Sequence, residues 1–278
     1  MYRFISDDLT GTVLTATAPD PRALEALFSF WAEAGVEMCY ADSPVDRTLP
    51  PPRPTPPKLN LVATTPLPGL QAGPDPVLAL AEARQRAAEA TDLESLKSAI
   101  EAFRGCPLRD LGARQVVFGR GNPKGRILAI GEAPGVDEDL QGLPFVGRSG
   151  QLLDRMLKAA GIFDETFITN TVYWSPPGNR QPTQAEQLVL SPFVEKTIRL
   201  IQPRAILLIG GMAAKGLLGK DEGILKLRGQ WFDWAGETPG PTIKALPTLH
   251  PAFLLRQSAS KKLAWEDLLK LSETLIDP

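Results

Sequence analysis

Three polar side chains stand where they could take part in a reaction, because each follows a run of apolar residues that indicates a buried strand. Glu132 comes one glycine after residues 126–130, Asn170 closes a second run, and His250, the single histidine of the chain, follows a third. A carboxylate can support a water molecule, an amide can pair with one edge of a pyrimidine ring, and an imidazole can donate a hydrogen bond to a leaving group. Asparagine is also a common turn residue and a histidine can simply cap a strand, so position alone leaves both interpretations open.

The loop after residues 126–130 combines glycines, carboxylates and an aromatic ring. Gly131 and Gly135 would let backbone N–H groups approach a ligand closely. Glu132 and Glu138, together with the ring of Phe145, would suit holding a flat heterocycle. The alternative is a solvated acidic loop in which the ring fills the core. Neither GxGxxG nor GxxxxGK[ST] occurs, which disfavours a dinucleotide or nucleoside triphosphate site.

The segment beyond the histidine is expected to form an exposed loop. Leu254 and Leu255 beside Arg256 would then suit a wedge that enters a stack of bases. Lys261 and Lys262 follow and could hold phosphates, or they could be the solvated start of a helix.

Alternating strands and helices would position these residues. Apolar runs predict four strands, at residues 126–130, 167–171, 205–209 and 243–248. Helical patterns are found at residues 78–104, 151–160, 183–200, 211–218 and 263–275, and a Thr-x-x-Glu capping box opens the third of them. This alternation indicates a parallel sheet covered on both faces. Ligands bind beyond the carboxyl ends of such strands, which selects residues 131–135, 170, 210–211 and 250.

The first hundred residues differ from the rest in composition. Residues 1–100 hold 8 basic and 13 acidic residues, whereas residues 101–278 hold 22 and 19, so the second part is mildly basic although the whole chain carries a net charge of −2. A helical pattern at residues 20–40 precedes a stretch dense in proline. We therefore expect an N-terminal helical segment at residues 1–43, a Pro-rich linker at 44–76 and the main domain at 77–278.

Composition excludes several other classes of protein. No apolar run in the 278 residues approaches the length of a membrane span, and the first residues lack a signal-peptide pattern. Two cysteines and one histidine make a disulfide framework and a protein-bound metal improbable. We expect a cytoplasmic monomer that has no membrane contact and no cofactor.

Taken together, five segments are similar in order and spacing to the uracil-DNA glycosylase superfamily, and within it to family 4. They are Gly-Glu-Ala-Pro-Gly at 131–135, Gln-Gly-x-Pro-Phe-Val-Gly-Arg at 141–148, Ile-Thr-Asn at 168–170, Pro-Pro-Gly-Asn-Arg at 176–180 and His-Pro-Ala-Phe-Leu-Leu-Arg at 250–256. The resemblance spans about residues 101–278. It implies a three-layer α/β/α fold with a four-stranded parallel sheet, and an enzyme that hydrolyses the bond between uracil and deoxyribose in DNA and so initiates base excision repair.

The resemblance also implies roles for the residues singled out above. Glu132 and Glu138 resemble residues that shape the pocket and support the attacking water, and Phe145 resembles the ring that stacks on the flipped base. Asn170 resembles the residue that recognises the pyrimidine edge, and His250 resembles the histidine that faces uracil O2. The residues expected to contact DNA are Arg148, Asn179, Arg180, Leu254, Leu255, Arg256, Lys261 and Lys262.

The chain departs from family 4 at the iron–sulfur cysteines. Cys106 matches the second of the four cysteines that typically hold a [4Fe–4S] cluster, but Phe103, Trp174 and Ser191 occupy the other three positions. One thiolate cannot hold such a cluster, so we expect none, with Phe103 and Trp174 packed in its place.

Two further departures concern the chemistry. Ala133 stands where family 1 has the aspartate that positions water, and Gly135 stands where family 1 has the tyrosine that excludes thymine. Glu132 or Glu138 would have to replace the aspartate, or catalysis would rest mainly on stabilising the leaving group. Two other functions remain open: a glycosylase of broader range that also removes hypoxanthine or xanthine, and a protein that binds uracil in DNA without hydrolysis. A branch that cross-links to DNA through a loop histidine is disfavoured, because it has glutamine in the place of Glu132 and a second histidine.

Overall fold

A computed structural model describes residues 75–276 of the chain. The helical segment predicted at residues 1–43 and almost all of the linker predicted at 44–76 lie outside the described residues. The described part is built on one sheet with the strand order β1-β3-β2-β4-β6-β5. Its four central strands are parallel: β2 (Ile127–Gly131), β3 (Thr166–Asn170), β4 (Ala205–Ile209) and β6 (Ile243–Thr248). These are the four strands that the apolar runs predicted.

The expectation of a four-stranded sheet is corrected, because two short antiparallel strands flank the parallel ones. They are β1 (Gly119–Gly121), which pairs with β3, and β5 (Phe232–Trp234), which pairs with β6. Each has only three residues, and β1 is Gly-Arg-Gly, so neither carries the apolar run that marks a buried strand.

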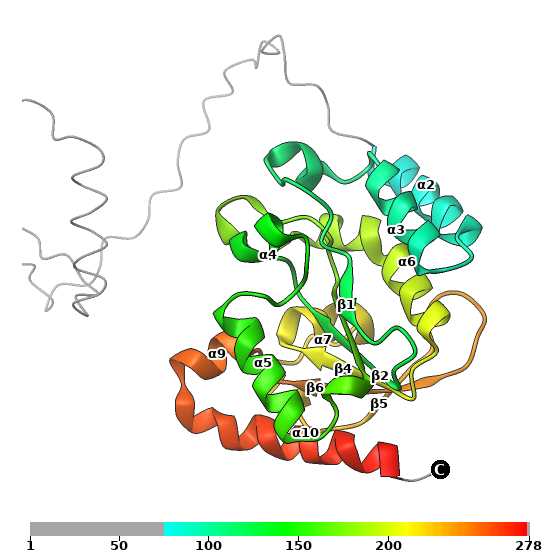
Figure 1. The fold of residues 1–278 in the computed structure, drawn as a ribbon. Coiled ribbons are helices and arrows are strands. Elements are labelled where there is room, and N and C mark those ends of the chain that lie inside the picture. Colours follow the sequence, from blue (N-terminus) through cyan, green and yellow to red (C-terminus); the bar gives the residue numbers. More distant parts are fainter. Residues whose placement is uncertain (1–74, 277–278) are drawn as a thin grey trace, which may run out of the picture. The chain divides into compact units, whose positions relative to one another are not determined.

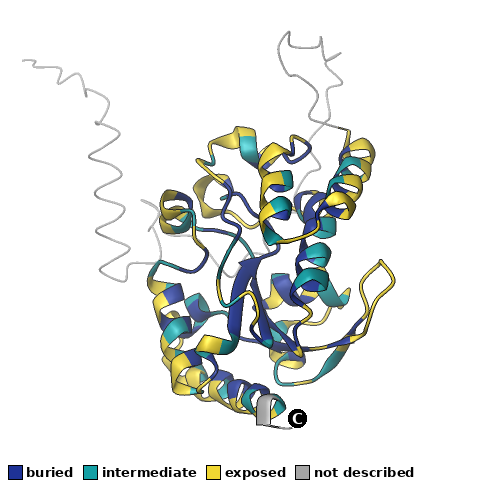
Figure 2. Cartoon of the chain, turned by 45° about the vertical axis from the view of Figure 1, so that its right-hand side comes forward, coloured by how far each residue is buried: buried dark blue, intermediate teal, exposed yellow. Residues whose placement is uncertain are grey.

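Helices cover both faces of the sheet and complete the three layers (Figure 1). Strand β2 shows how the faces divide, because its side chains alternate. Leu128 and Ile130 belong to a core shared with α2 (Pro76–Glu89), α3 (Leu93–Ala102) and α6 (Gln184–Ile201). Ile127 and Ala129 belong to a core on the other face, shared with α5 (Arg148–Ala159) and α10 (Lys261–Ile276). Figure 2 shows the strands buried between helices whose outer faces are exposed.

Capping residues set several helix boundaries. The capping box that opens α6 is confirmed: the Thr183 side chain accepts a hydrogen bond from Glu186 N at 3.2 Å, and the Glu186 carboxylate accepts one from Thr183 N at 2.7 Å. The helical pattern at 78–104 corresponds to two helices, α2 and α3, because Asp92 starts α3 with its own capping box to Ser95. The remaining helices are short: η1 (Pro107–Leu111), α4 (Val136–Gln141), η2 (Phe163–Glu165), η3 (Pro177–Asn179), α7 (Gly211–Leu218), α8 (Ile224–Leu227), α9 (Pro251–Arg256) and η4 (Ser258–Ser260). Among the described residues, no helix is both long and apolar enough to cross a membrane.

Candidate functional site

A cleft of about 860 Å³ opens where the parallel strands end. Its lining includes many of the residues singled out from the sequence: Glu132, Gly135, Glu138, Phe145, Arg148, Asn179, Arg180, His250 and Arg256. It also includes residues for which the sequence suggested no role: Asp137, Ser149, Gln181, Met212, Ile224 and Phe253. The latter come from loops and helix starts, where neither spacing nor residue type distinguishes a lining residue from an ordinary surface one.

Asn170 is not itself part of the cleft lining, but it lies beside Phe145, which is, and its amide is unpaired. It is 1% exposed, and neither its Oδ1 nor its Nδ2 has a hydrogen-bond partner within the described residues. A buried amide without partners is costly, so its presence points to a ligand that supplies them. Asn170 stands opposite Gly131 on β2, where a Cβ would come 2.5 Å from Asn170 Oδ1 and 2.4 Å from the ring of Phe145. Because Gly131 has no side chain, the amide of Asn170 and the ring of Phe145 can lie close together.

Phe145 is held in an unusual backbone conformation beside the histidine. Its φ is 55°, in the left-handed region that bulky residues rarely adopt, and its ring centroid lies 5.9 Å from that of His250. Arg120 fixes this turn by donating to Pro144 O at 2.6 Å and to Phe145 O at 2.9 Å. Gly150 is required below it, since a Cβ there would lie 1.7 Å from Phe145 O. The ring is thus locked at the cleft wall.

His250 caps the short helix α9 as a neutral imidazole. Its Nδ1 accepts a hydrogen bond from Ala252 N at 3.1 Å, which leaves Nε2 to carry the proton. Burial, with a smaller contribution from the charge of Arg256, lowers the pKa of His250 from 6.5 to about 4, although Glu138 opposes the shift. At neutral pH the imidazole is therefore an uncharged donor that faces the cleft.

The two glutamates of the pocket loop have different surroundings. The Glu138 carboxylate accepts hydrogen bonds from the backbone N–H groups of Gly135 (3.1 Å), Val146 (2.9 Å) and Gly147 (3.0 Å). It therefore braces the loop. Glu132 is half-buried at the cleft wall, and burial raises the pKa of its carboxyl above 4.5.

A buried ion pair fixes the strand end beside the histidine. The guanidinium of Arg228 donates to both carboxylate oxygens of Asp267 on α10, and Thr248 Oγ1 donates to the same carboxylate at 2.8 Å. The Asp267 side chain is fully buried, so its charge depends on these partners. Thr248 closes β6 two residues before His250, so the network links the last helix to the site.

The residues expected to bind DNA differ in how they are held. Arg148 and Asn179 are exposed at the cleft rim, and Lys261 and Lys262 are exposed at the start of α10. Arg180 instead forms two hydrogen bonds to the buried carboxylate of Glu186, at 2.6 and 2.9 Å.

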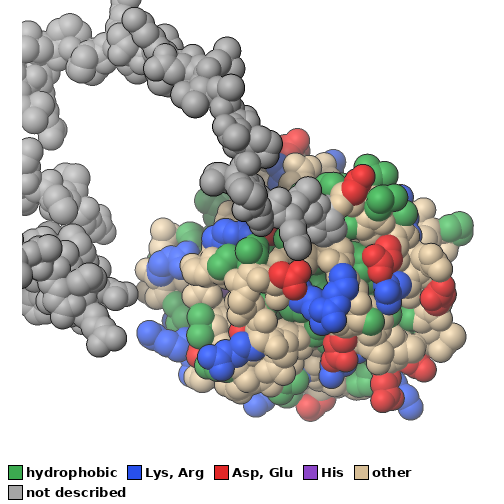
Figure 3. All heavy atoms as spheres, turned by 90° about the horizontal axis from the view of Figure 1, so that it is seen from above, with side chains coloured by type: hydrophobic (Ala, Val, Ile, Leu, Met, Phe, Trp, Pro, Cys, Tyr) green, Lys and Arg blue, Asp and Glu red, His purple; other side chains and the backbone are tan. Residues whose placement is uncertain are grey.

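One face of the molecule carries charges of both signs. On the face that Figure 3 shows, Lys and Arg side chains are interspersed with Asp and Glu rather than gathered in one patch. Recognition of a polyanion would then depend on a few placed contacts more than on net charge.

The prediction of an exposed loop after the histidine is wrong. Residues 251–256 form α9, and Leu254 is 0% exposed because it packs with Leu152, Leu249 and Ala264. It is therefore not available as a wedge. Leu255, which is 38% exposed, and Arg256 remain on the outer face of the helix.

The residues at the family 4 cluster positions do not fit an iron–sulfur cluster. Phe103, Cys106 and Trp174 are buried in one apolar core, where the rings of Phe103 and Phe193 meet edge to face at 5.3 Å. Burial raises the pKa of the Cys106 thiol to about 12, so this thiol stays protonated. The Ser191 hydroxyl donates to Leu188 O within α6 at 2.9 Å.

The fold and the site together define a class of protein: an α/β protein with a parallel sheet whose strand ends enclose an unpaired amide, an aromatic ring and a neutral imidazole. The family model of the uracil DNA glycosylase superfamily matches residues 118–269, which is more than half of the chain. The chain therefore belongs to the uracil-DNA glycosylase superfamily, a family of DNA glycosylase enzymes.

Curated relatives agree with this assignment. The type-4 uracil-DNA glycosylase of Thermotoga maritima is 37% identical over 182 residues, which cover 64% of this chain and 92% of that protein. The type-4 enzyme of Sulfurisphaera tokodaii is 36% identical over 192 residues, 67% of this chain and 86% of that protein. A type-5 uracil-DNA glycosylase of Mycobacterium leprae is 36% identical over 115 residues, which cover 35% of this chain and 50% of that one.

Proposed function

We propose that the protein hydrolyses the N-glycosidic bond between uracil and deoxyribose in DNA, the step that initiates base excision repair. The observation that carries the proposal is the buried, unpaired amide of Asn170 beside Phe145. Uracil presents a carbonyl oxygen and an N–H on one edge, and an amide can satisfy both. The base must leave the helix to reach this depth, and contacts in the pocket offset the cost of unstacking it.

The leaving group would be stabilised by His250. When the C1′–N1 bond breaks, its electron pair moves to N1 of uracil and spreads onto O2. The Nε2–H of a neutral imidazole can donate to that oxygen without first losing a proton from a cation. A donor of this kind lowers a barrier by about 3 kcal/mol in other enzymes.

Water would attack the sugar from the side of Glu132. The water oxygen bonds to C1′, and its proton passes to the Glu132 carboxylate, whose raised pKa makes it a better proton acceptor. Glu138 would position rather than react, because its two oxygens are occupied by three backbone N–H groups.

The DNA strand would lie along the cleft rim. Arg148, Asn179 and Arg256 line the cleft, and Lys261 and Lys262 are exposed at the start of α10, which follows α9. Such contacts position the backbone without reading sequence. Action as a monomer and a location in the cytoplasm remain predictions.

One assay tests this function against its alternatives. Oligonucleotides that carry uracil, hypoxanthine, xanthine or thymine at one position are incubated with the protein and treated with alkali, and strand breaks are counted on a gel. We expect breaks at uracil and none at thymine. The Asn170→Ala variant should lose the activity, whereas Asn122→Ala, an amide in a turn away from the cleft, should retain it. Breaks at hypoxanthine or xanthine would indicate the broader range, and uracil-specific binding without breaks would indicate a non-hydrolytic function.

A further inference from the structure

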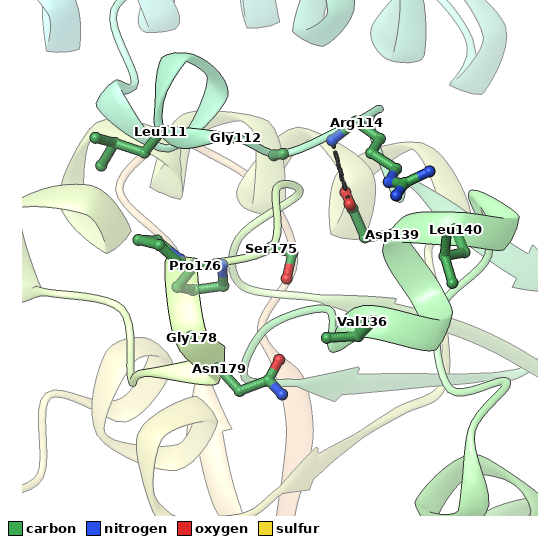
Figure 4. Close-up of a pocket in the computed structure, with 12 residues that line it drawn as sticks. Leu111, Gly112, Arg114, Val136, Asp139, Leu140, Ser175, Pro176, Gly178 and Asn179 are labelled. Carbon is green, nitrogen blue, oxygen red and sulfur yellow. Dashed lines mark hydrogen bonds between the residues drawn. The ribbon is translucent and has the colours of Figure 1, made fainter. Parts of the chain in front are cut away.

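A second, smaller hollow lies beside the cleft, and no residue role proposed above accounts for it. It measures about 210 Å³ and has three walls (Figure 4). The first wall is the segment 111–114, the second is the face of α4 that carries Val136 and Leu140, and the third is the segment 175–179. We infer that this hollow, hereafter the flanking pocket, receives the base of the nucleotide next to the uracil. This inference rests on the proposed function.

The flanking pocket continues the cleft. Val136 and Asn179 line both hollows, and their side chains face each other at the edge of the flanking pocket (Figure 4). A strand that places one nucleotide in the cleft and runs past this edge would bring the neighbouring nucleotide to the flanking pocket.

The walls are fixed before any ligand arrives. Arg114 N donates to both carboxylate oxygens of Asp139, at 3.0 and 3.2 Å, and Gln115 Nε2 donates to the carbonyl oxygens of Asp139 and Leu140, at 2.9 and 3.0 Å. These bonds join the first wall to the second. The third wall is followed in the chain by Arg180, which is fixed by its ion pair with Glu186 on α6. A pre-formed hollow loses little entropy when it binds a ligand.

The chemistry of the lining favours a neutral, flat group. Leu111, Val136 and Leu140 are each at least half exposed, at 51%, 57% and 50%, so the lining offers apolar surface to water. The Ser175 hydroxyl is a small polar group within it, and the guanidinium of Arg114 points away beyond Asp139 (Figure 4). The Asp139 carboxylate at the wall would repel a phosphate. The lining as a whole is thus about equally apolar and polar, and a base, with its apolar faces and polar edges, can match both kinds of surface.

A cycle of variants and substrates tests the inference. Single-stranded oligonucleotides carry uracil with thymine on both sides, or with an abasic analogue on the 5′ or the 3′ side. Single-turnover rates and anisotropy affinities are measured for the wild type and for a Leu111→Ser/Leu140→Ser variant, whose two residues line the flanking pocket but not the cleft. A Leu188→Ser/Leu269→Ser variant serves as the control, because these leucines are similarly exposed on α6 and α10. Circular dichroism melting checks that both variants fold.

We expect the wild type and the control to lose about fivefold or more in rate or affinity when the base on one side is removed, as for the loss of one stacked base. The pocket variant should lose less than about twofold for the same change, because its contact with that base is already gone. An equal loss in the wild type and the pocket variant on both sides would overturn the inference, as would no loss in the wild type. Failure to release uracil would contradict the proposed function instead, and the affinities would still decide whether the flanking base is bound.

Discussion

At the scale of single residues, the proposed function assigns three separate tasks to three side chains. Asn170 supplies unpaired hydrogen-bonding groups, His250 a neutral donor, and Glu132 a carboxylate whose pKa burial raises. Glu138 accepts hydrogen bonds from three backbone N–H groups of its own loop. Each task can be tested with a substitution that keeps the local structure.

The donor role of His250 is tested by two substitutions. His250→Ala and His250→Asn should both reduce single-turnover cleavage by about a hundredfold or more, because both remove the Nε2–H donor. Asparagine is a good N-cap and should keep α9 capped, so its melting temperature should stay nearer to that of the wild type. If His250→Asn cleaves at close to the wild-type rate, His250 contributes only to the helix cap.

The pH dependence of the rate should identify Glu132. Its raised pKa means that the carboxylate is lost as pH falls through a value above 4.5, while His250, with a pKa of about 4, is still neutral there. We therefore expect kcat to decrease as the pH is lowered, with the midpoint of this decrease above pH 4.5. Glu132→Gln should lower kcat by about a hundredfold and flatten this limb. An unchanged acid limb in Glu132→Gln would assign it to another group.

At the scale of elements, aromatic packing takes the place that a metal cluster would need. Three segments contribute an aromatic ring each to one apolar core: Phe103 at the end of α3, Trp174 after β3, and Phe193 in α6. Apolar contacts there bury surface that would otherwise be exposed, and so hold the same segments together.

Protein purified anaerobically should therefore contain no stoichiometric iron or sulfide and should keep its activity in chelator. Cys106→Ala should also retain activity, with only the modest loss in melting temperature that removal of one buried sulfur causes. Iron and sulfide at cluster stoichiometry, or activity that depends on Cys106, would contradict this account.

Elements differ in how far the sequence predicts them. The four parallel strands and the α6 capping box follow from local patterns and are confirmed. The strands β1 and β5 are too short to carry a pattern. They form by pairing with β3 and β6, the outer strands of the parallel part of the sheet. The burial of Leu254 could not be foreseen, because its partner Leu152 is about a hundred residues away in sequence and only the fold brings the two together. The cleft follows from the strand ends, but Arg120 and its hold on the Phe145 turn depend on tertiary contact.

At the scale of the whole molecule, α2 and α3, which precede the residues matched by the family model, pack into the core of the domain. Ala79 and Ala83 of α2 and Leu96 and Ile100 of α3 are buried in the core that also contains residues of α6. The family model starts at residue 118, so similarity to the superfamily alone would place the boundary of the domain too late.

A fragment of residues 75–278 should fold and should cleave uracil oligonucleotides with a kcat/KM close to that of the full chain. A fragment of residues 101–278 should be insoluble or should melt far lower, because the loss of α2 and most of α3 uncovers the α6 face. Solubility, melting curves and kcat/KM at matched salt compare the three proteins. A stable and active 101–278 fragment would show that α2 and α3 are dispensable.

The link from Asp267 to Thr248 and Arg228 has a consequence for how the protein is made. A chain emerges from the ribosome from its N-terminus, and parallel strands far apart in sequence pair late. Asp267 follows His250 by seventeen residues, so every residue that lines the cleft is synthesised before it. The strand end before His250 is then still unanchored. Nascent chains should accordingly be inactive until α10 has been synthesised and has packed against β6, and activity measured on chains stalled before and after α10 would test this.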